Sequence, residues 1–257
     1  MSVKSEASER LLVALCLAIL IFSLTVKSVG AQVDQVTLKP TDDTYVDSGS
    51  PDSNYGGRNY LQIMNYNSQI NSNGTHESIV WLKFNLSSVP EGAVIDGATL
   101  QLWTSSVNGS FSVNAYSGTD LLNESAIISW TELTMAYSNM PFYNTTSMDS
   151  VLVEASGQWY NWSVLDAVRD ALNNTARTMT IVLYDPSPHG LVSAIWFDSK
   201  ESSTAYAPML TVHWSAIVPE FPTFLILALF MIASLPATVI YRKKRIRTWI
   251  ENARYRN

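Results

Sequence analysis

The sequence predicts an all-β fold, a jelly-roll β-sandwich with one short helix, between an N-terminal signal segment and one C-terminal transmembrane helix. Two observations predict the sandwich: apolar and polar residues alternate along many short runs, and turns rich in Gly, Pro, Ser and Asp separate these runs. The inward-facing sets are Val80/Leu82/Phe84/Leu86, Ala98/Leu100/Leu102, Phe111/Val113/Ala115, Met179/Ile181/Leu183 and Leu210/Val212/Trp214. About ten such strands in one domain favour two packed β-sheets.

One segment departs from the two-residue period. Val164, Val168 and Leu172 follow one another at intervals of four residues, which places them on one face of an amphipathic helix over 164–172. Ser163 directly precedes this helix, and we expect its side chain to cap the N-terminus.

The first 31 residues have the pattern of a secretory signal peptide. A charged start precedes an uncharged apolar run over 11–24, and small residues then predict cleavage before Gln32. An uncleaved membrane anchor is the alternative, but the run is short for a span of ~20 residues. The only cysteine, Cys16, lies in this segment, so the cleaved protein has no disulfide.

Residues 221–241 form a second apolar segment of 21 residues without a charge, long enough to cross a bilayer core. The following tail, 242–257, contains seven Lys and Arg residues, and such clusters remain in the cytoplasm. We therefore expect a single-pass protein of the cell membrane, with 34–216 outside and the basic tail inside. A buried core helix, the alternative, fits poorly beside so many basic residues.

The segment expected outside, 34–216, contains 18 Asp and Glu residues against six Lys and Arg, a net charge of −12. Nucleic-acid-binding proteins show a basic patch, so this balance argues against a nucleic-acid partner. The segment also contains seven Asn-x-Ser/Thr sequons, and export permits their glycosylation. The predicted glycosylation sites lie in loop-like stretches: Asn73, Asn108, Asn123, Asn144 and Asn173. The other two, Asn85 and Asn161, lie within or at the ends of predicted strands.

Several motifs follow one another in a familiar order. They are 41–46 (TDDTYV), 51–56 (PDSNYG), 84–100 (FNLSSVPEGAVIDGATL), 130–132 (WTE), 197–201 (FDSKE) and 208–212 (PMLTV). Over nearly all of 36–214 the sequence resembles the DNRLRE domain family, which is related to archaeal disaggregatase and is also classed as a carbohydrate-binding module. The resemblance implies a glycan-binding jelly-roll module on cell-surface proteins.

A second resemblance directly precedes the apolar span. Residues 218–222 (VPEFP) are similar to the PEF sorting signal of archaeal surface proteins, near which a sortase-like membrane enzyme can cut. The resemblance leaves two possibilities for 217–241. The segment is either a permanent membrane anchor, or a sorting signal that is cleaved off and leaves the domain at the extracellular surface.

Four aspartates form an acidic loop: Asp42, Asp43, Asp47 and Asp52. Carboxylate and carbonyl oxygens are the ligands that Ca²⁺ prefers, so we predict that these four residues hold a structural calcium ion. The resemblance adds that jelly-roll modules often hold such an ion. Ordinary turn chemistry is the alternative, because Asp side chains also stabilise turns.

Aromatic residues are dense in the run WYNW at 159–162. Because flat rings stack on the apolar faces of sugars, Trp159, Tyr160 and Trp162 are candidate ligand-binding residues. Alternation places Trp159 on one face of its strand and the other two rings on the opposite face. Arg58 is a further candidate, since an acidic domain needs a local cation to bind a charged glycan. The tryptophans expected in the core are Trp81, Trp103 and Trp214.

The sequence contains no recognisable catalytic motif. None of its three His residues lies in a His-Glu-x-x-His pattern, and there is no Gly-x-Ser-x-Gly elbow or phosphate-binding Gly loop. We therefore expect a non-catalytic protein. Two functions remain: a membrane-anchored, surface-displayed module that binds polysaccharides or cell-envelope glycans, or a structural or adhesive envelope glycoprotein without affinity for free sugars.

Overall fold

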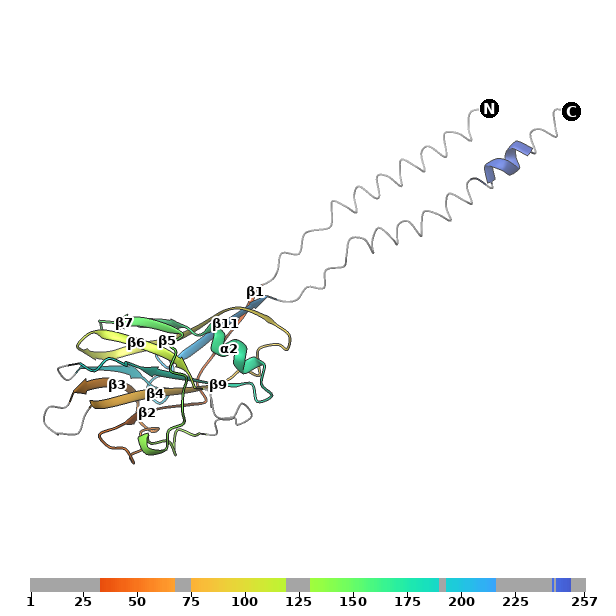
Figure 1. Ribbon diagram of the computed structural model, residues 1–257. Coiled ribbons are helices and arrows are strands. Elements are labelled where there is room, and N and C mark those ends of the chain that lie inside the picture. The colour runs from red at the N-terminus through yellow and green to blue at the C-terminus, as the bar shows by residue number, and fades with distance from the viewer. Residues whose placement is uncertain are drawn as a thin grey trace. The chain divides into compact units, whose positions relative to one another are not determined.

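The computed structural model describes residues 33–67, 75–118, 130–189, 193–215, 242 and 244–250. The chain divides into two compact units, Met1–Ala216 and Ile217–Asn257. All eleven described strands belong to the first unit (Figure 1).

The mostly-β prediction is confirmed. The strands are β1 (Val33–Leu38), β2 (Asp42–Asp47), β3 (Tyr60–Asn67), β4 (Thr75–Asn85), β5 (Val94–Asn108), β6 (Phe111–Ser117), β7 (Asp149–Val153), β8 (Trp159–Ser163), β9 (Thr178–Tyr184), β10 (Ala194–Asp198) and β11 (Met209–Ser215). The described residues of this unit also form one turn of 3₁₀ helix, η1 (Tyr137–Asn139), and one α-helix, α2 (Leu165–Leu172).

The strands pair antiparallel and form one curled sheet in the order β1-β11-β5-β10-β3-β4-β9-β6-β7, with β2 on β4 and β8 on β5. Strand β5 joins two halves of this sheet, because 94–103 pairs with β11 and β8 whereas 104–108 pairs with β10. We call the half made of β1, β11, β8 and 94–103 sheet A, and the remainder sheet B. The ladder between β1 and β11 begins with Val33 opposite Ser215, so the domain starts and ends at one place in sheet A.

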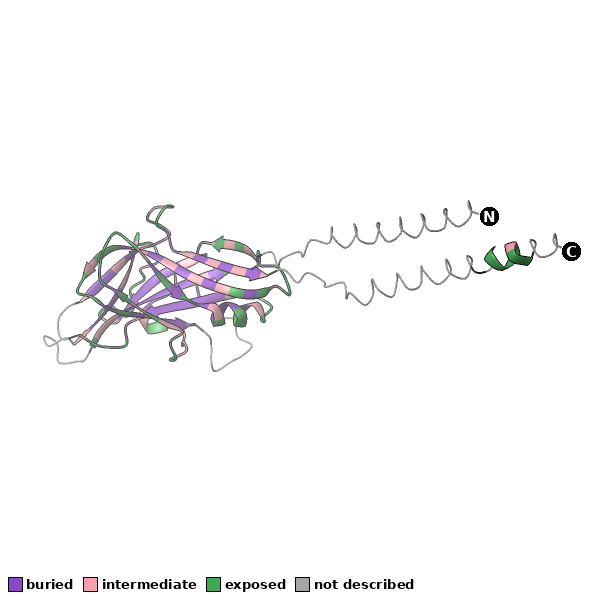
Figure 2. Cartoon of the chain, turned by 90° about the horizontal axis from the view of Figure 1, so that it is seen from above, coloured by how far each residue is buried: buried purple, intermediate pink, exposed green. Residues whose placement is uncertain are grey.

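The main hydrophobic core lies between sheets A and B, since strands of both contribute its residues. Buried residues recur along these strands in Figure 2. All five predicted inward-facing sets are buried, as the two-residue period requires. Leu100 of sheet A and Phe84 of sheet B, for example, are both 0% exposed. Because every residue of the described hydrophobic clusters lies within 33–215, the fragment 33–216 retains the whole described core, and we expect it to fold without the second unit.

A second apolar cluster covers the outer face of sheet B. Trp81 of β4 is fully buried on this face and lies edge-on to Trp130 and Tyr143, at centroid distances of 6.3 and 5.9 Å. Lys83 fixes the covering segment by donating its Nζ to the Trp130 carbonyl. Strand β4 is therefore buried on both faces, whereas the outward side chains of sheet A are half-buried or exposed.

The predicted helix is confirmed as α2, which packs three buried residues onto the main core: Ala167, Val168 and Ala171. The predicted N-cap is wrong. Ser163 still pairs with Thr99 as the last residue of β8, and its backbone N–H donates to Asp149 Oδ2 at 2.7 Å. This strand pairing leaves Val164 at the N-cap position, without a side-chain capping bond.

The predicted signal segment, 1–31, and the predicted span, 221–241, lie outside the described residues. Within the described part of the chain, no helix combines the length and the apolar character that a membrane crossing requires. In the second unit, residues 244–250 are helical, and Ile246 and Trp249 are exposed on them.

Candidate functional site

The outer face of sheet A presents polar and aromatic side chains in rows that run across its strands. The strand register defines four rows: Trp103/Trp159, Met209/Gln101/Asn161, Thr37/Thr211/Thr99/Ser163 and Gln35/His213/Gly97. All of these residues are half-buried or exposed, because the residues between them point into the core. The face therefore combines an aromatic end with a polar strip.

Three rings form the aromatic end, which we call the aromatic trio: Trp103 of β5, Trp159 of β8, and Tyr206 from the turn before β11. Trp103 stacks on Tyr206 at a centroid distance of 4.5 Å and meets Trp159 edge-on at 5.6 Å. Tyr206 is 40% exposed. Such a cluster offers apolar ring surface together with the polar ends of Tyr and Trp, as sugar-binding surfaces do.

Polar groups adjoin the trio in the next two rows. Gln101 donates its Nε2–H to Asn161 Oδ1 at 2.9 Å, and the hydroxyls of Thr37 and Thr211 are 3.2 Å apart. These amides and hydroxyls both donate and accept hydrogen bonds, as sugar hydroxyls do. The strip is therefore suited to a hydroxyl-rich ligand.

Of the four predicted ligand-binding residues, only Trp159 lies on this face. Tyr160 and Trp162 point into the core: Tyr160 accepts a hydrogen bond from the Ala155 N–H at 2.9 Å, and Trp162 is 0% exposed. Their burial means that they hold β8 in place and offer no ring surface to a ligand. Arg58 is exposed in the loop between β2 and β3, where its carbonyl accepts a hydrogen bond from Ser199 Oγ.

Two members of the trio were not among the predicted binding residues. The core position predicted for Trp103 is wrong, because its side chain lies on the outer face of sheet A. Alternation could have predicted this outward position, since Leu100 and Leu102 point inward and the residue after Leu102 must point outward. Tyr206 lies in a turn without any periodic pattern, so only the tertiary structure reveals it. Trp81 and Trp214 are buried in the cores, as predicted.

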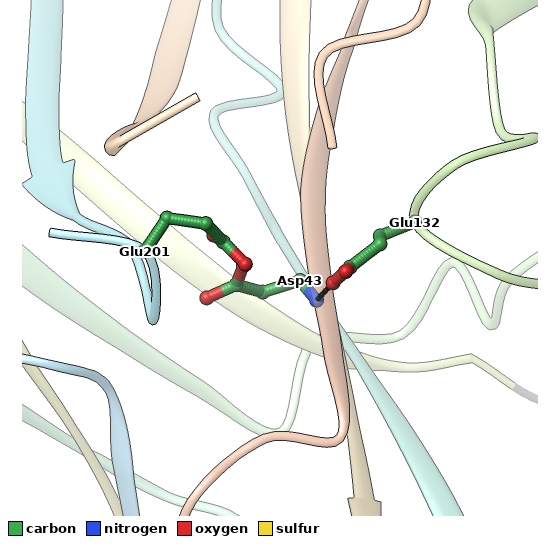
Figure 3. Close-up of side chains that lie close together, drawn as sticks. All are labelled: Asp43, Glu132 and Glu201. Atoms are coloured by element: carbon green, nitrogen blue, oxygen red, sulfur yellow. Dashed lines mark hydrogen bonds between the residues drawn. The ribbon is translucent and has the colours of Figure 1, made fainter. Parts of the chain in front are cut away.

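A second cluster brings three carboxylates together from distant parts of the sequence (Figure 3). Asp43 of β2, Glu132 and Glu201 each contribute an oxygen, and these oxygens all lie within 4.8 Å of one another. The Asp43 backbone N–H donates to Glu132 Oε2 at 3.2 Å, and the Asp43 side chain points toward Glu201 (Figure 3). We call these residues the acidic cluster.

Lys200 partly neutralises the acidic cluster. Its Nζ lies 2.8 Å from Glu132 Oε2 and also contacts Glu201, while its backbone N–H donates to Asp43 Oδ2 at 2.8 Å. Burial by itself lowers the pKa of Lys200, but the hydrogen bonds to Glu132 and Glu201 outweigh it and raise that pKa above its ordinary value. Three carboxylates against one ammonium leave an excess of two negative charges when all are ionised.

Asp43 is the most deeply buried residue of the acidic cluster, because it is only 1% exposed. Burial, reinforced by the neighbouring Glu201, raises the pKa of Asp43 to about 8 against the lowering effect of the Lys200 N–H. Its Oδ1 is buried without a hydrogen-bond partner among the described residues. An oxygen-only donor set with an unsatisfied buried oxygen, which carries an excess of two negative charges once Asp43 is ionised, fits a hard divalent cation such as Ca²⁺.

The structure separates the four aspartates predicted to bind calcium. Only Asp43 belongs to the acidic cluster. Asp42 pairs with Lys83 at 3.5 Å, Asp47 Oδ1 lies 2.6 Å from His76 Nε2, and Asp52 is exposed. The two glutamates of the cluster were not predicted as ligands, although both belong to the motifs WTE and FDSKE. Their presence in these two motifs was the sequence signal that could have identified them as ligands.

Both the aromatic trio and the acidic cluster lie in a part of the sequence that matches a known family. A family model matches residues 34–213, a range that includes nearly all of sheets A and B, the aromatic trio and the acidic cluster. The chain belongs to carbohydrate-binding module family 96. A search of curated proteins found no match. The expected resemblance to a carbohydrate-binding module is thus confirmed at the level of family 96, while the DNRLRE assignment and the sorting signal stay predictions.

The predicted glycosylation sites of this family 96 module lie in different surroundings. Asn108 and Asn173 are exposed at the ends of β5 and α2, and Asn144 is half-buried in the loop before β7. Asn73 and Asn123 lie outside the described residues. The remaining sequons are at Asn85, the exposed last residue of β4, and at Asn161, on the outer face of sheet A.

Proposed function

We propose that the protein is a non-catalytic carbohydrate-binding module of jelly-roll type whose glycan lies on the outer face of sheet A. The aromatic trio carries this proposal: three rings gather beside a row of amides and hydroxyls, on the half of the sheet that the described apolar clusters leave uncovered. Membership of family 96 supports the ligand class. The trio supports the location.

Substitution of the three trio residues tests whether the glycan binds on the outer face of sheet A. Trp103 contacts both other rings, so we expect Trp103→Ala to weaken glycan binding at least tenfold and Trp159→Ala or Tyr206→Ala to weaken it by roughly three- to tenfold. Isothermal titration with a polysaccharide retained by the wild type measures these losses. Phe142→Ala is the matched control, because Phe142 is 70% exposed and lies outside the four rows. Unchanged affinity in all three trio variants would refute the location.

A structural or adhesive envelope glycoprotein is the second candidate, and one observation favours it. The exposed Asn161 is a sequon residue in the middle of the proposed binding face, between the trio and Ser163. A glycan attached there would cover the rows, so occupancy of Asn161 and binding of free polysaccharide exclude each other. Intact-mass measurement of protein from the native host, compared with Asn161→Gln, distinguishes them. Full occupancy favours the structural role.

We also propose that the module is exported and displayed at the cell surface. The sequence of 1–31 supports a cleaved signal, and 221–241 followed by the basic tail supports one membrane span with the tail in the cytoplasm. The motif at 218–222 supports processing by a sortase-like enzyme. Protease accessibility of the domain on intact cells tests the display, and a membrane-free form ending near 222 would support processing.

We further propose a structural calcium ion held by Asp43, Glu132 and Glu201, with no catalytic part. The unpartnered Asp43 Oδ1 supports it. In this arrangement Lys200 competes for the same carboxylates, so its side chain would turn away from at least one glutamate when the ion binds. The ion would join the start of β2 and the turn after β10 to the segment around Glu132, and thereby stabilise the domain.

A further inference from the structure

We propose that the helix over 244–250 binds the surface of an anionic lipid bilayer, with its apolar side chains among the lipid headgroups. This inference goes beyond glycan binding, and of the proposed function it rests only on the membrane span at 221–241. The starting observation is that three large apolar side chains are exposed on one short helix of the second unit (Figure 2).

The apolar face of this helix consists of Ile246, Trp249 and Ile250. These residues are three and four positions apart, so their side chains lie next to one another on the helix surface. All three are exposed, and Trp249, at 74%, is the most exposed large apolar residue of the described chain. Apolar side chains that are exposed together indicate contact with a partner or a membrane.

Basic side chains flank this apolar face. At 3.6 residues per turn, Arg245 and Arg247 lie about 100° to either side of Ile246. Both are exposed, and the aliphatic part of an Arg side chain can follow an apolar surface while its guanidinium group binds phosphate. Arg242 and Lys244 are two further exposed cations, and the described residues of this helix include no Asp or Glu.

The opposite side of the helix is polar. Lys244 and Thr248 are four residues apart and lie on the side away from Ile246. Thr248 Oγ1 donates to the Lys244 carbonyl at 2.8 Å, so this hydroxyl already has a partner within the helix. An apolar face, cationic flanks and a polar back are typical of helices that lie in the membrane interface.

The position of the helix in the sequence favours a lipid surface over a soluble acidic partner. The helix closely follows 221–241, so the proposed span would keep it beside the headgroups, where their effective concentration is high. A helix over 244–250 is only about 10 Å long, too short to be stable in water by itself. An anionic bilayer supplies both apolar contact and negative charge, whereas a soluble polyanion supplies only the charge.

Fluorescence quenching by brominated acyl chains tests the lipid contact. The full-length protein is reconstituted in nanodiscs of brominated phosphatidylcholine, either alone or mixed with phosphatidylglycerol. Subtraction of the Trp249→Phe signal isolates Trp249 among the eight tryptophans. We expect the quenching of Trp249 to be at least about twofold greater in the anionic nanodiscs, and to fall toward the neutral value in ~1 M salt, where the Debye length is about 3 Å.

Matched substitutions test the geometry. Arg245→Gln and Lys244→Gln each remove one positive charge, but only Arg245 lies beside the apolar face. In anionic nanodiscs we expect Arg245→Gln to lower the quenching of Trp249 by about twofold and Lys244→Gln to lower it much less. The double variant Ile246→Ser/Ile250→Ser should lower it by at least about twofold, because it removes most of the apolar face.

The remaining outcomes overturn the inference in distinguishable ways. Weak quenching in both nanodiscs would mean that the helix stays in water, although a protein that co-elutes with the nanodiscs still has its span. Equally strong quenching in both would refute the preference for anionic lipid. Weak quenching together with binding of fluorescent poly-glutamate would assign the basic residues to an acidic protein partner. Failure to co-elute with any nanodisc would overturn the span and this inference together, and would leave glycan binding by 33–216 unaffected.

Discussion

Trp162→Ala is expected to lower the free energy of unfolding by about 3–5 kcal/mol, whereas Trp159→Ala, in the same strand, should cost about 1 kcal/mol or less. Trp162 is fully buried and lies edge-on to Phe197 at 5.8 Å. Its Nε1–H donates to the Val113 carbonyl at 2.8 Å. Removal of the ring leaves a cavity and an unpaired buried carbonyl, while removal of Trp159 exposes surface that water can reach.

Urea unfolding of the 33–216 fragment measures both losses. Trp162→Phe is the intermediate case: it keeps most of the ring volume but removes the donor, so we expect a loss of about 1–2 kcal/mol and a protein that still folds. Polysaccharide affinity should respond in the opposite way, with Trp159→Ala weakened and Trp162→Phe close to wild type. Equal destabilisation by the two alanine substitutions would contradict the placement of these rings on opposite faces of β8.

Asp43→Asn is expected to change the pH dependence of stability. In the folded protein burial raises the pKa of Asp43 to about 8, whereas the unfolded carboxyl ionises near its ordinary value of 3.8. The stability that the protonated, buried carboxyl contributes is complete below pH 4 and is lost as the pH rises through 8, because the unfolded state releases its proton first. Each pKa unit is worth about 1.4 kcal/mol, and with some relaxation of Lys200 toward the ionised group we expect a loss of about 2–3 kcal/mol.

Thermal unfolding between pH 4 and 9 in EDTA measures this loss. The wild type should become less stable with rising pH, and Asp43→Asn should be flatter and more stable than the wild type at pH 8. Added calcium should restore stability to the wild type at pH 8 and do little for Asp43→Asn, since the substitution removes a ligand. Asp52→Asn is the control, because Asp52 is exposed. Parallel curves for wild type and Asp43→Asn would refute the role assigned to the buried carboxyl.

Sequence periodicity predicted much of the fold because burial in a sheet follows a two-residue rule. The five inward-facing sets are buried, and Trp159 and Trp162 lie on opposite sides of β8, as alternation required. Trp81 is buried as predicted, but alternation assigns it to the outer face of β4 and cannot tell that the segment around Trp130 covers that face. The N-cap failed for a related reason: the ladder with β5 held Ser163 in the strand.

The sites were less predictable, because each one is assembled from residues far apart in the chain. Asp43, Glu132 and Glu201 meet only after β2, the loop around Trp130 and the turn after β10 have packed together. Local density instead grouped Asp43 with Asp42, Asp47 and Asp52, whose carboxylates lie outside the cluster, although Asp42 Oδ1 accepts a hydrogen bond from the Glu132 N–H at 3.3 Å. Likewise, Trp103 and Trp159 are opposite each other through strand register, a property that the spacing in the chain does not record.

The position of Val33 opposite Ser215 determines how the domain responds to a pulling force. A force between the two ends of the domain acts perpendicular to β1 and β11. It therefore breaks their six residue pairs one after another, whereas a force along the strands would load all six pairs together. If the domain is held at one end alone, that ladder bears no such load. Resistance of the module to drag or shear should therefore depend on how many of its ends are attached.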